Sequence, residues 1–241
     1  MHPSQPEHSS QPSRSKAIRL SPLVFIFTTI LINRIGMSIL FPILPFLVER
    51  FRSDALTLGL LTSCFAGTQF LATPAIGAIS DRYGRRPVML ICVLGSAISY
   101  FMFGWAGALW VLFLSRILDG ITGGVSATAQ AYIADTSKPG ERSKNFGLTG
   151  VAFGLGFVLG PALGGALAGI DITFPIFFAG SLALLNVILG YFTLPESLSP
   201  EKRRPIRLQD LNPLNQITDL LRNRKIRGFL WATFIFNFAF T

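Results

Sequence analysis

The chain has 241 residues and a formal net charge of +9; half of its residues are hydrophobic and only 14% are charged. Soluble domains usually contain about 25% charged residues, and the apolar runs in this chain are long enough to cross a bilayer, which excludes a soluble fold. The basic residues lie in short loops between these runs, a distribution typical of cytoplasmic loops in membrane proteins and not of a nucleic-acid-binding surface.

A polar tail precedes the first apolar run. Residues 1–19 are rich in Ser, Pro and Gln, a composition that predicts a disordered segment. The apolar run that follows is too long for a signal peptide and continues through Pro42 and Pro45. We therefore expect the tail to lead directly into membrane-spanning helices.

Six apolar runs predict six membrane-spanning α-helices, since a helix needs about 20 mostly apolar residues to cross a bilayer. Together they predict one bundle over residues 20–194, followed by a basic cytoplasmic linker over 195–227. Residues 228–241 begin a seventh apolar run, and 14 residues are too few to cross, so we expect a chain that is cut short early in that helix. The six predicted spans are residues 20–48, 56–80, 88–107, 109–134, 146–170 and 174–194.

The distribution of Lys and Arg predicts the orientation of the bundle. Seventeen of the 21 basic residues fall in the tail, in the loops after the second and fourth spans and in the linker, whereas two, Arg50 and Arg52, fall in the other loops. Basic loops face the cytoplasm, which predicts a multi-pass protein of the cell (inner or plasma) membrane with a cytoplasmic N-terminus. The two remaining basic residues, Arg34 and Arg116, lie within predicted spans.

The fourth predicted span carries polar residues at intervals of three and four positions. Such intervals place side chains on one face of a helix, and charges inside a span are costly and usually functional. We interpret this face as the lining of a water-filled cavity; a structural Arg–Asp pair that bridges helices is the alternative. The face comprises Arg116, Asp119, Gly123, Ser126 and Gln130.

Two other spans supply polar candidates for the same substrate and proton pathway. Gln69 belongs to a weaker polar stripe of the second span, for which contacts between packed helices are the alternative explanation. Asn33 and Arg34 are adjacent in the first span and point about 100° apart, so at most one of them can face squarely into a cavity. Arg34 can instead reach the fourth span or a carboxylate.

Glycines recur along the fifth predicted span at intervals of four residues, a spacing that allows helices to approach closely. Pro161 removes a backbone donor and predicts a kink. Tight packing alone is the alternative explanation of these glycines. The residues concerned are Gly156, Gly160, Pro161, Gly164 and Gly165.

The loop after the second span reads GAISDRYGRRPVML and resembles the signature loop of the major facilitator superfamily, a glycine followed by D-R-x-G-R-R/K. An ordinary basic loop, the alternative, does not require the fixed Gly, Asp and Gly of this pattern. The resemblance implies a cytoplasmic gating loop, whose charges bind neighbouring helix ends and hold that side closed. The matching positions are Gly77, Asp81, Arg82, Gly84, Arg85 and Arg86.

Other segments support the same resemblance. FLSRILDGITGG is similar to the span-four motif R-x-x-Q-G, with Asp119 in place of Gln, and GLGFVLGPALGG is similar to the span-five motif of antiporters. IGMSILFPILPFL resembles the span-one motif of drug/proton antiporters, and AYIADTSKPGERSKNFG resembles tetracycline/proton antiporters. Those antiporters carry an Asp in span one where this chain has Asn33, which cannot titrate. The resemblance therefore implies an all-α integral membrane fold, the six-span N-terminal half of a major facilitator carrier built from 3+3 inverted repeats.

The resemblance also implies a function. We expect a secondary transporter that exports a small organic compound or drug in exchange for protons by alternating access. Asp119 would carry the proton or contact the substrate, and Arg116 would modulate it. Two alternatives stay open: a gradient-driven carrier of an endogenous, anionic metabolite, and a half-carrier fragment that transports nothing. The expected partners are a small-molecule substrate, protons, the lipid bilayer and the missing C-terminal six-span half.

No catalytic or cofactor site is predicted. Cys64 and Cys92 lie inside apolar spans, and His2 and His8 lie in the tail, so the sequence offers neither metal-ligand spacing nor a disulfide framework. No nucleophile–base set or phosphate-binding loop accompanies them, and we expect no metal, cofactor or enzymatic activity.

Overall fold

The computed structural model describes residues 22–51 and 54–206, with isolated positions between 211 and 235. Within these residues six helical stretches are long and apolar enough to cross a membrane, which confirms the six predicted spans. The predicted tail over 1–19 and nearly all of the predicted seventh-span start over 228–241 lie outside the described residues. The spans are Pro22–Ile39, Ala55–Tyr83, Arg85–Gly104, Leu109–Thr136, Arg142–Ala168 and Phe174–Thr193.

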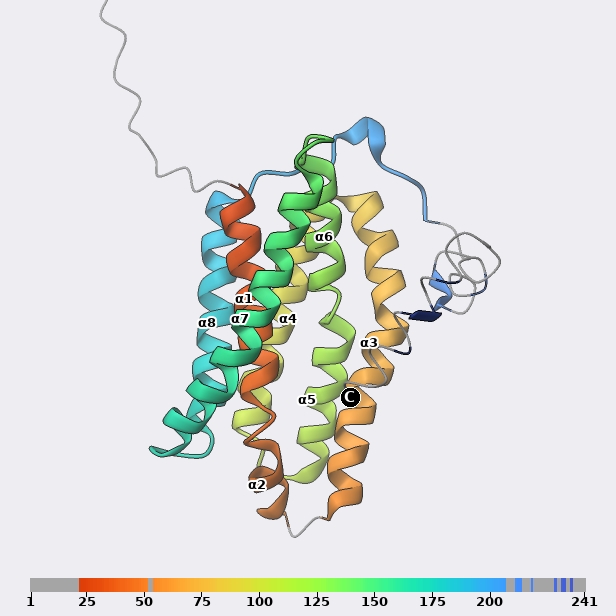
Figure 1. Cartoon of the computed structure of the whole chain (residues 1–241). Helices are drawn as coiled ribbons and strands as arrows, with labels where there is room; N and C mark the ends of the chain where they lie inside the picture. Colours follow the sequence, from red (N-terminus) through yellow and green to blue (C-terminus); the bar gives the residue numbers. More distant parts are fainter. Residues whose placement is uncertain are drawn as a thin grey trace, which may run out of the picture.

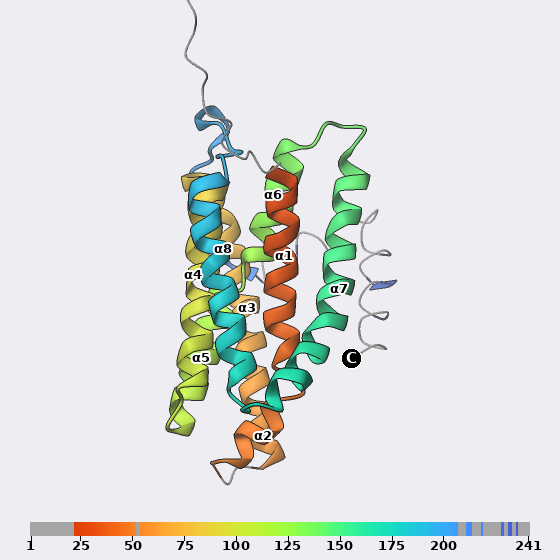
Figure 2. The same cartoon turned by 90° about the vertical axis from the view of Figure 1, so that its left-hand side faces the viewer.

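The helices run alternately down and up through one bundle (Figures 1 and 2). The turn between α3 and α4, the loop between α6 and α7 and the segment that follows α8 meet at the upper end in Figure 1. We call this the motif end, because it carries the loop that reads DRYGRR. In chain order the helices are α1 (Pro22–Ile39), α2 (Leu44–Glu49), α3 (Ala55–Tyr83), α4 (Arg85–Gly104), α5 (Leu109–Thr122), α6 (Val125–Thr136), α7 (Arg142–Ala168) and α8 (Phe174–Thr193).

Helix packing repeats between the first three spans and the last three. α1 packs mainly against α7 and α8, whereas α5 and α6, which form the fourth span, pack mainly against α3 and α4. The third and sixth spans, α4 and α8, also pack against each other. The packing is symmetric between the two sets of three spans: the contact of span one with span five, for example, corresponds to the contact of span four with span two. Spans one and four run in opposite directions (Figure 1). This is the arrangement that 3+3 inverted repeats produce.

The first span is shorter than predicted. A single helix over 20–48 was expected, but α1 ends at Ile39, and a turn over residues 40–43 leads into the short α2. Pro42 has no backbone N–H to continue the α1 hydrogen-bond ladder, and Pro45 then occupies an N-terminal position of α2, where a missing donor costs nothing. Hydropathy alone misses this turn, because its side chains remain apolar.

The fourth span is not one continuous helix either. α5 ends at Thr122 and α6 starts at Val125, so Gly123 and Gly124 interrupt the predicted helix over 109–134. The two glycines lie where α3 approaches closely: a Cβ atom on Gly124 would lie only 2.5 Å from Cγ2 of Ile76. The side-chain amide of Gln69 in α3 donates to the Gly123 carbonyl across 3.4 Å, which partly satisfies the interrupted backbone.

The glycines of the fifth span let α7 lie directly on α1. Cβ atoms on Gly156 and Gly160 would overlap Arg34 and Ser38 of α1, and Ser38 donates a 2.8 Å hydrogen bond to the Gly156 carbonyl. A Cβ atom on Gly164 would lie only 2.9 Å from the Ile39 carbonyl oxygen, whereas one on Gly165 would meet open space. Pro161 lies inside the helix, and the lower part of α7 bends in Figure 2, as its missing donor predicts.

Candidate functional site

A cavity of about 480 Å³ opens between α1, α3 and the break in the fourth span. It lies where four of the predicted pathway residues meet: Arg34 from α1, Gln69 from α3, and Gly123 and Ser126 from the break. The other walls are largely apolar. Cavities of this size hold drug-sized molecules.

Arg34 is the charged side chain of this cavity. Its Nη2 donates to the Ser126 hydroxyl across 3.0 Å, and its guanidinium carbon lies 3.5 Å from the ring centroid of Phe153 in α7. Its Nη1 reaches the Met37 sulfur at 3.6 Å, whereas its Nε is buried without a hydrogen-bond partner among the described residues. The prediction that Arg34 can reach the fourth span therefore agrees with its contact to Ser126.

Asp119 and Arg116 form an ion pair in the interior of the bundle. Arg116 Nη1 lies 3.5 Å from Asp119 Oδ2, and the two residues are only 6% and 5% exposed. Ser96 and Ser99 of α4 lie beside the same carboxylate. The arginine also stacks on aromatic rings, 4.6 Å from the Phe103 centroid, which compensates part of the cost of burying its charge.

A small hollow lies between this ion pair and the cavity. It holds only about 10 Å³ and is lined by Asp119 together with Arg34, Gln69 and Gly123, which also line the cavity. Asn33 and Arg34 both line the hollow, although their adjacent positions led us to expect that at most one could face it squarely. The side chain of Asp119 thus borders this hollow, whereas Arg116 does not line it.

A third hollow, of about 360 Å³, continues from the cavity toward the motif end. Thr73, Pro74 and Ala127 line both spaces, and Asp81 and Arg204 line the far end. Three neighbouring hollows that share lining residues therefore follow the contact between α3 and the fourth span, from Asp119 to the motif end.

The predicted polar face of the fourth span is split by the helix break. Gly123 and Ser126 line the cavity and Asp119 lines the small hollow, but Arg116 lines none of the three hollows. Gln130 lies on an exposed part of α6 beyond the cavity. The break at Gly123 and Gly124 separates Arg116 and Asp119 in α5 from Ser126 in α6, but it does not separate Ser126 from Gln130.

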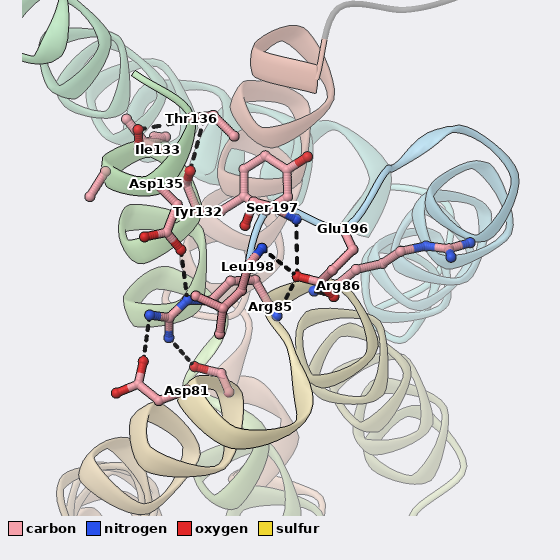
Figure 3. Close-up of polar contacts among 12 residues, drawn as sticks. Asp81, Arg85, Arg86, Tyr132, Ile133, Asp135, Thr136, Glu196, Ser197 and Leu198 are labelled. Carbon is pink, nitrogen blue, oxygen red and sulfur yellow. Dashed lines mark hydrogen bonds and ion pairs between the residues drawn. The ribbon is translucent and has the colours of Figure 1, made fainter. Parts of the chain in front are cut away.

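Arg85 organises a cluster of polar contacts at the motif end (Figure 3). Its guanidinium pairs with Asp81 of the preceding turn and, across 3.1 Å, with Asp135 at the end of α6. Its Nη1 also donates to the Ser80 hydroxyl across 2.6 Å. These contacts join the ends of α3, α4 and α6.

Glu196, which follows α8, caps the first turn of α4 (Figure 3). Its Oε1 accepts from the Arg85 amide across 2.9 Å, and its Oε2 accepts from the Arg86 amide across 3.2 Å. Gly84 makes room for this carboxylate: its φ of 110° is one that residues with a side chain rarely adopt, and a Cβ atom there would overlap Glu196. Arg86 donates to the Tyr191 carbonyl in the last turn of α8.

The other motif positions make fewer contacts. Arg82 is exposed beside the Tyr83 ring, 5.4 Å from its centroid, and a Cβ atom on Gly77 would meet open space. Glu196 and Asp135 were not among the predicted site residues. Two sequence features could have indicated them. Glu196 belongs to a Pro-Glu-Ser sequence directly after the sixth span, and Asp135 stands at the end of the fourth.

Within the described part of the chain, no group of three or more His, Cys, Asp or Glu residues could hold a metal ion. The polar side-chain groups of the cavity are instead a guanidinium, two hydroxyls and an amide, which bind by hydrogen bonds and charge.

Six spans in inverted repeats, a polar cavity inside the bundle and an ion-pair cluster at one end define a half of a carrier-type membrane protein. The chain belongs to the major facilitator superfamily, whose sequence model matches residues 26–241. Proteins of this family are transporters and not enzymes.

Individual relatives place the chain near drug-resistance carriers. It is 40% identical over 196 residues to the tetracycline resistance protein, class C, of Escherichia coli, covering 80% of this chain and 49% of that protein. It is 31% identical over 228 residues to multidrug resistance protein 2 of Bacillus subtilis (strain 168), covering 93% of this chain and 57% of that protein. The chain thus spans about half the length of the relatives it matches.

A solved structure shows the same fold. The crystal structure of the human organic anion transporter MFSD10 (TETRAN) superposes with a TM-score of 0.74 at 31% sequence identity. The match covers 86% of this chain and 57% of the human one. The fold and the predicted six-span half are therefore confirmed, together with the relation to tetracycline and multidrug resistance proteins.

Proposed function

We propose that the chain forms the N-terminal half of a proton-coupled antiporter that exports a small organic compound or drug by alternating access. The observation that carries this proposal is the position of Asp119. Its carboxylate is buried against Arg116, yet it borders a small hollow that shares Arg34 and Gln69 with the cavity. Asp119 is thus a group that can exchange a proton with the cavity while remaining shielded from lipid.

The direction of the hollows supports a route for that proton. We infer that the motif end faces the cytoplasm, together with the N-terminus, because the predicted basic loops gather there. The three neighbouring hollows between Asp119 and the Asp81 end would then extend toward the cytoplasmic side. Proton release from Asp119 toward that side would accompany solute loading from it.

The cluster around Arg85 suits a cytoplasmic gate. Its contacts to Asp81 and Asp135, and the cap from Glu196, tie four helix ends together. Breaking these bonds would let the end of α3 move relative to α6, along the line of the hollows. In this proposal Gly77 and Arg82, which make few contacts in this half, face the second six-span half.

Substrate, protons, bilayer and a second six-span half are the proposed partners. Besides α1, α3 and the fourth span, Pro213 of the linker lines the cavity, and carriers of this architecture place their substrate between two halves. Tetracycline and multidrug resistance proteins are similar over this chain, which supports a drug-sized organic cargo.

A second candidate cargo is an organic anion carried along its own gradient. The charge of Arg34 in the cavity favours it, and the human relative of similar fold is described as an organic anion transporter. Solute flux in vesicles, measured with and without an imposed pH gradient, separates the two functions. Flux that requires the gradient supports the antiporter, and flux indifferent to it supports the second candidate.

A further inference from the structure

The positive charge of Arg34 is not balanced by an acidic partner within the described residues. The ion pairs there join Arg85 to Asp81 and Asp135, and Arg116 to Asp119. Asp119, the acidic residue that lines a hollow together with Arg34, is thus already occupied by Arg116. A charge inside a span that lacks a counter-ion marks a ligand or ion pathway.

The guanidinium of Arg34 is held in place before any ligand arrives. Its flat face lies on the Phe153 ring at 3.5 Å, and Nη2 is bound to the Ser126 hydroxyl at 3.0 Å. Stacking leaves the edge of a guanidinium available for two parallel hydrogen bonds to a carboxylate. The Ser126 hydroxyl accepts from Arg34 and therefore keeps its own proton to donate.

The break in the fourth span adds further hydrogen-bond donors, which carry partial positive charge. α6 is 12 residues long and begins at Val125, so its first turn lies at the wall of the cavity, where Gly123, Ser126 and Ala127 line the space. The first N–H groups of a helix lack intrahelical acceptors and carry partial positive charge. Interrupted spans of transporters use such half-helix starts to bind anionic substrate groups.

We propose that Arg34, Ser126 and the first turn of α6 form a subsite for an anionic group of the transported solute, most simply a carboxylate. The remaining walls fit an apolar body, since Ala66, Phe70 and Pro74 line the cavity on the α3 side. A volume of about 480 Å³ admits a small aromatic or alicyclic acid. The inference rests on the proposed transport function, because it names the substrate class of the same cavity.

Equilibrium binding to the purified chain in detergent tests this subsite without requiring transport. The probes are 2-naphthoate and its uncharged counterpart 2-naphthamide, which differ in charge and little in shape, and isothermal titration calorimetry measures both. The parent chain should bind the carboxylate at least about tenfold more tightly than the amide, as one charge-assisted hydrogen-bonded pair provides. Equal binding of the two probes, or binding of neither, overturns the proposal.

Matched variants then locate the preference. Arg34→Gln should reduce the affinity for the carboxylate to that for the amide, and Arg34→Lys should keep part of the difference, because a point charge lacks the guanidinium fork. Ser126→Ala should weaken carboxylate binding several-fold. Arg203→Gln removes the same charge at an exposed position after α8 and should change neither affinity. A carboxylate preference that survives in Arg34→Gln, with the variant monodisperse by gel filtration, overturns the assignment.

These binding measurements, together with the vesicle flux assay, separate this inference from the proposed function. If the carrier exchanges protons for solute but shows no preference for the carboxylate, the proposed subsite is contradicted and the proposed function is not. If the carboxylate is preferred but solute flux does not depend on protons, the proposed proton coupling is contradicted and the subsite is not.

Discussion

The Glu196 carboxylate accepts a 2.9 Å hydrogen bond from the backbone amide of Arg85, and through it the chain after the sixth span is joined to the first turn of α4. The same oxygen also accepts from the amides of Ser197 and Leu198, both at 3.0 Å. One side chain therefore shapes the turn after α8 and supplies a negative charge to the start of α4. Both effects stabilise a helix N-terminus.

Glu196→Ala should lower the free energy of unfolding by about 1–2 kcal/mol, the usual cost of losing a capping side chain. Glu196→Gln should cost less, because the amide oxygen still accepts from the backbone. Glu201→Ala, an exposed carboxylate of the same segment, is the matched control and should stay within about 0.5 kcal/mol of the parent. Thermal unfolding in detergent measures all three, and equal melting temperatures for Glu196→Ala and Glu201→Ala would contradict the capping role.

The glycines of α7 differ in what surrounds them, and this difference can be measured. A Cβ atom on Gly160 would overlap the Ser38 hydroxyl of α1, whereas one on Gly150 would meet open space. Gly160→Ala should therefore destabilise the bundle by about 1–3 kcal/mol through overpacking. Gly150→Ala should be neutral or slightly stabilising, since alanine favours a helix more than glycine does. The opposite order in thermal unfolding would show that α7 does not rest on α1 as described.

Arg116 and Asp119 should depend on each other strongly. Removing one member of a buried ion pair leaves an uncompensated charge and costs about 3–5 kcal/mol, whereas removing both is often nearly neutral. Arg116→Gln and Asp119→Asn should each destabilise the chain, and the double variant should be more stable than the sum of the two effects predicts. A double-mutant cycle by thermal unfolding measures this coupling; additive effects would mean that the pair is not formed.

The sequence predicted the spans and their number, because hydropathy over 20 residues depends on the bilayer and not on tertiary contacts. It did not predict the two interruptions. The turn after Ile39 is apolar, and the break at Gly123 depends on the close approach of Ile76 and Gln69 from α3. Both breaks are set by packing partners that are distant in the sequence.

The candidate site was predicted in part. Arg34, Gln69 and Ser126 meet in one cavity, because polar side chains inside a span gather away from lipid. Gln130 is on the same helical repeat but lies one turn beyond Ser126 in α6, where it is exposed and outside the cavity. Glu196 was missed because its partner Arg85 is 111 residues away, and no local pattern relates the two. Asn186, whose buried amide bonds Thr29 across 3.1 Å, was missed for the same reason.

The proton site needs a control carboxylate, and Asp171 supplies one. It lies in the loop between α7 and α8, where hydrogen bonds from the Thr173 hydroxyl and amide hold the pKa of its carboxyl below the ordinary value of 3.8. It therefore stays ionised down to a pH below that of an ordinary Asp and does not exchange protons near neutral pH. Asp171→Asn removes the same charge as Asp119→Asn without touching the hollows.

Proton exchange by the Asp119 variants in proteoliposomes tests the central claim most directly, with the chain assembled together with its second six-span half. A solute gradient is imposed, and proton movement is read from a pH-sensitive dye inside the vesicles. We predict that Asp119→Asn abolishes solute-driven proton movement, that Asp119→Glu retains part of it and that Asp171→Asn behaves as the parent. The double variant Arg116→Gln/Asp119→Asn, which leaves no buried charge unpaired, should also be inactive while remaining folded. Undiminished proton exchange in a folded Asp119→Asn carrier would contradict the account.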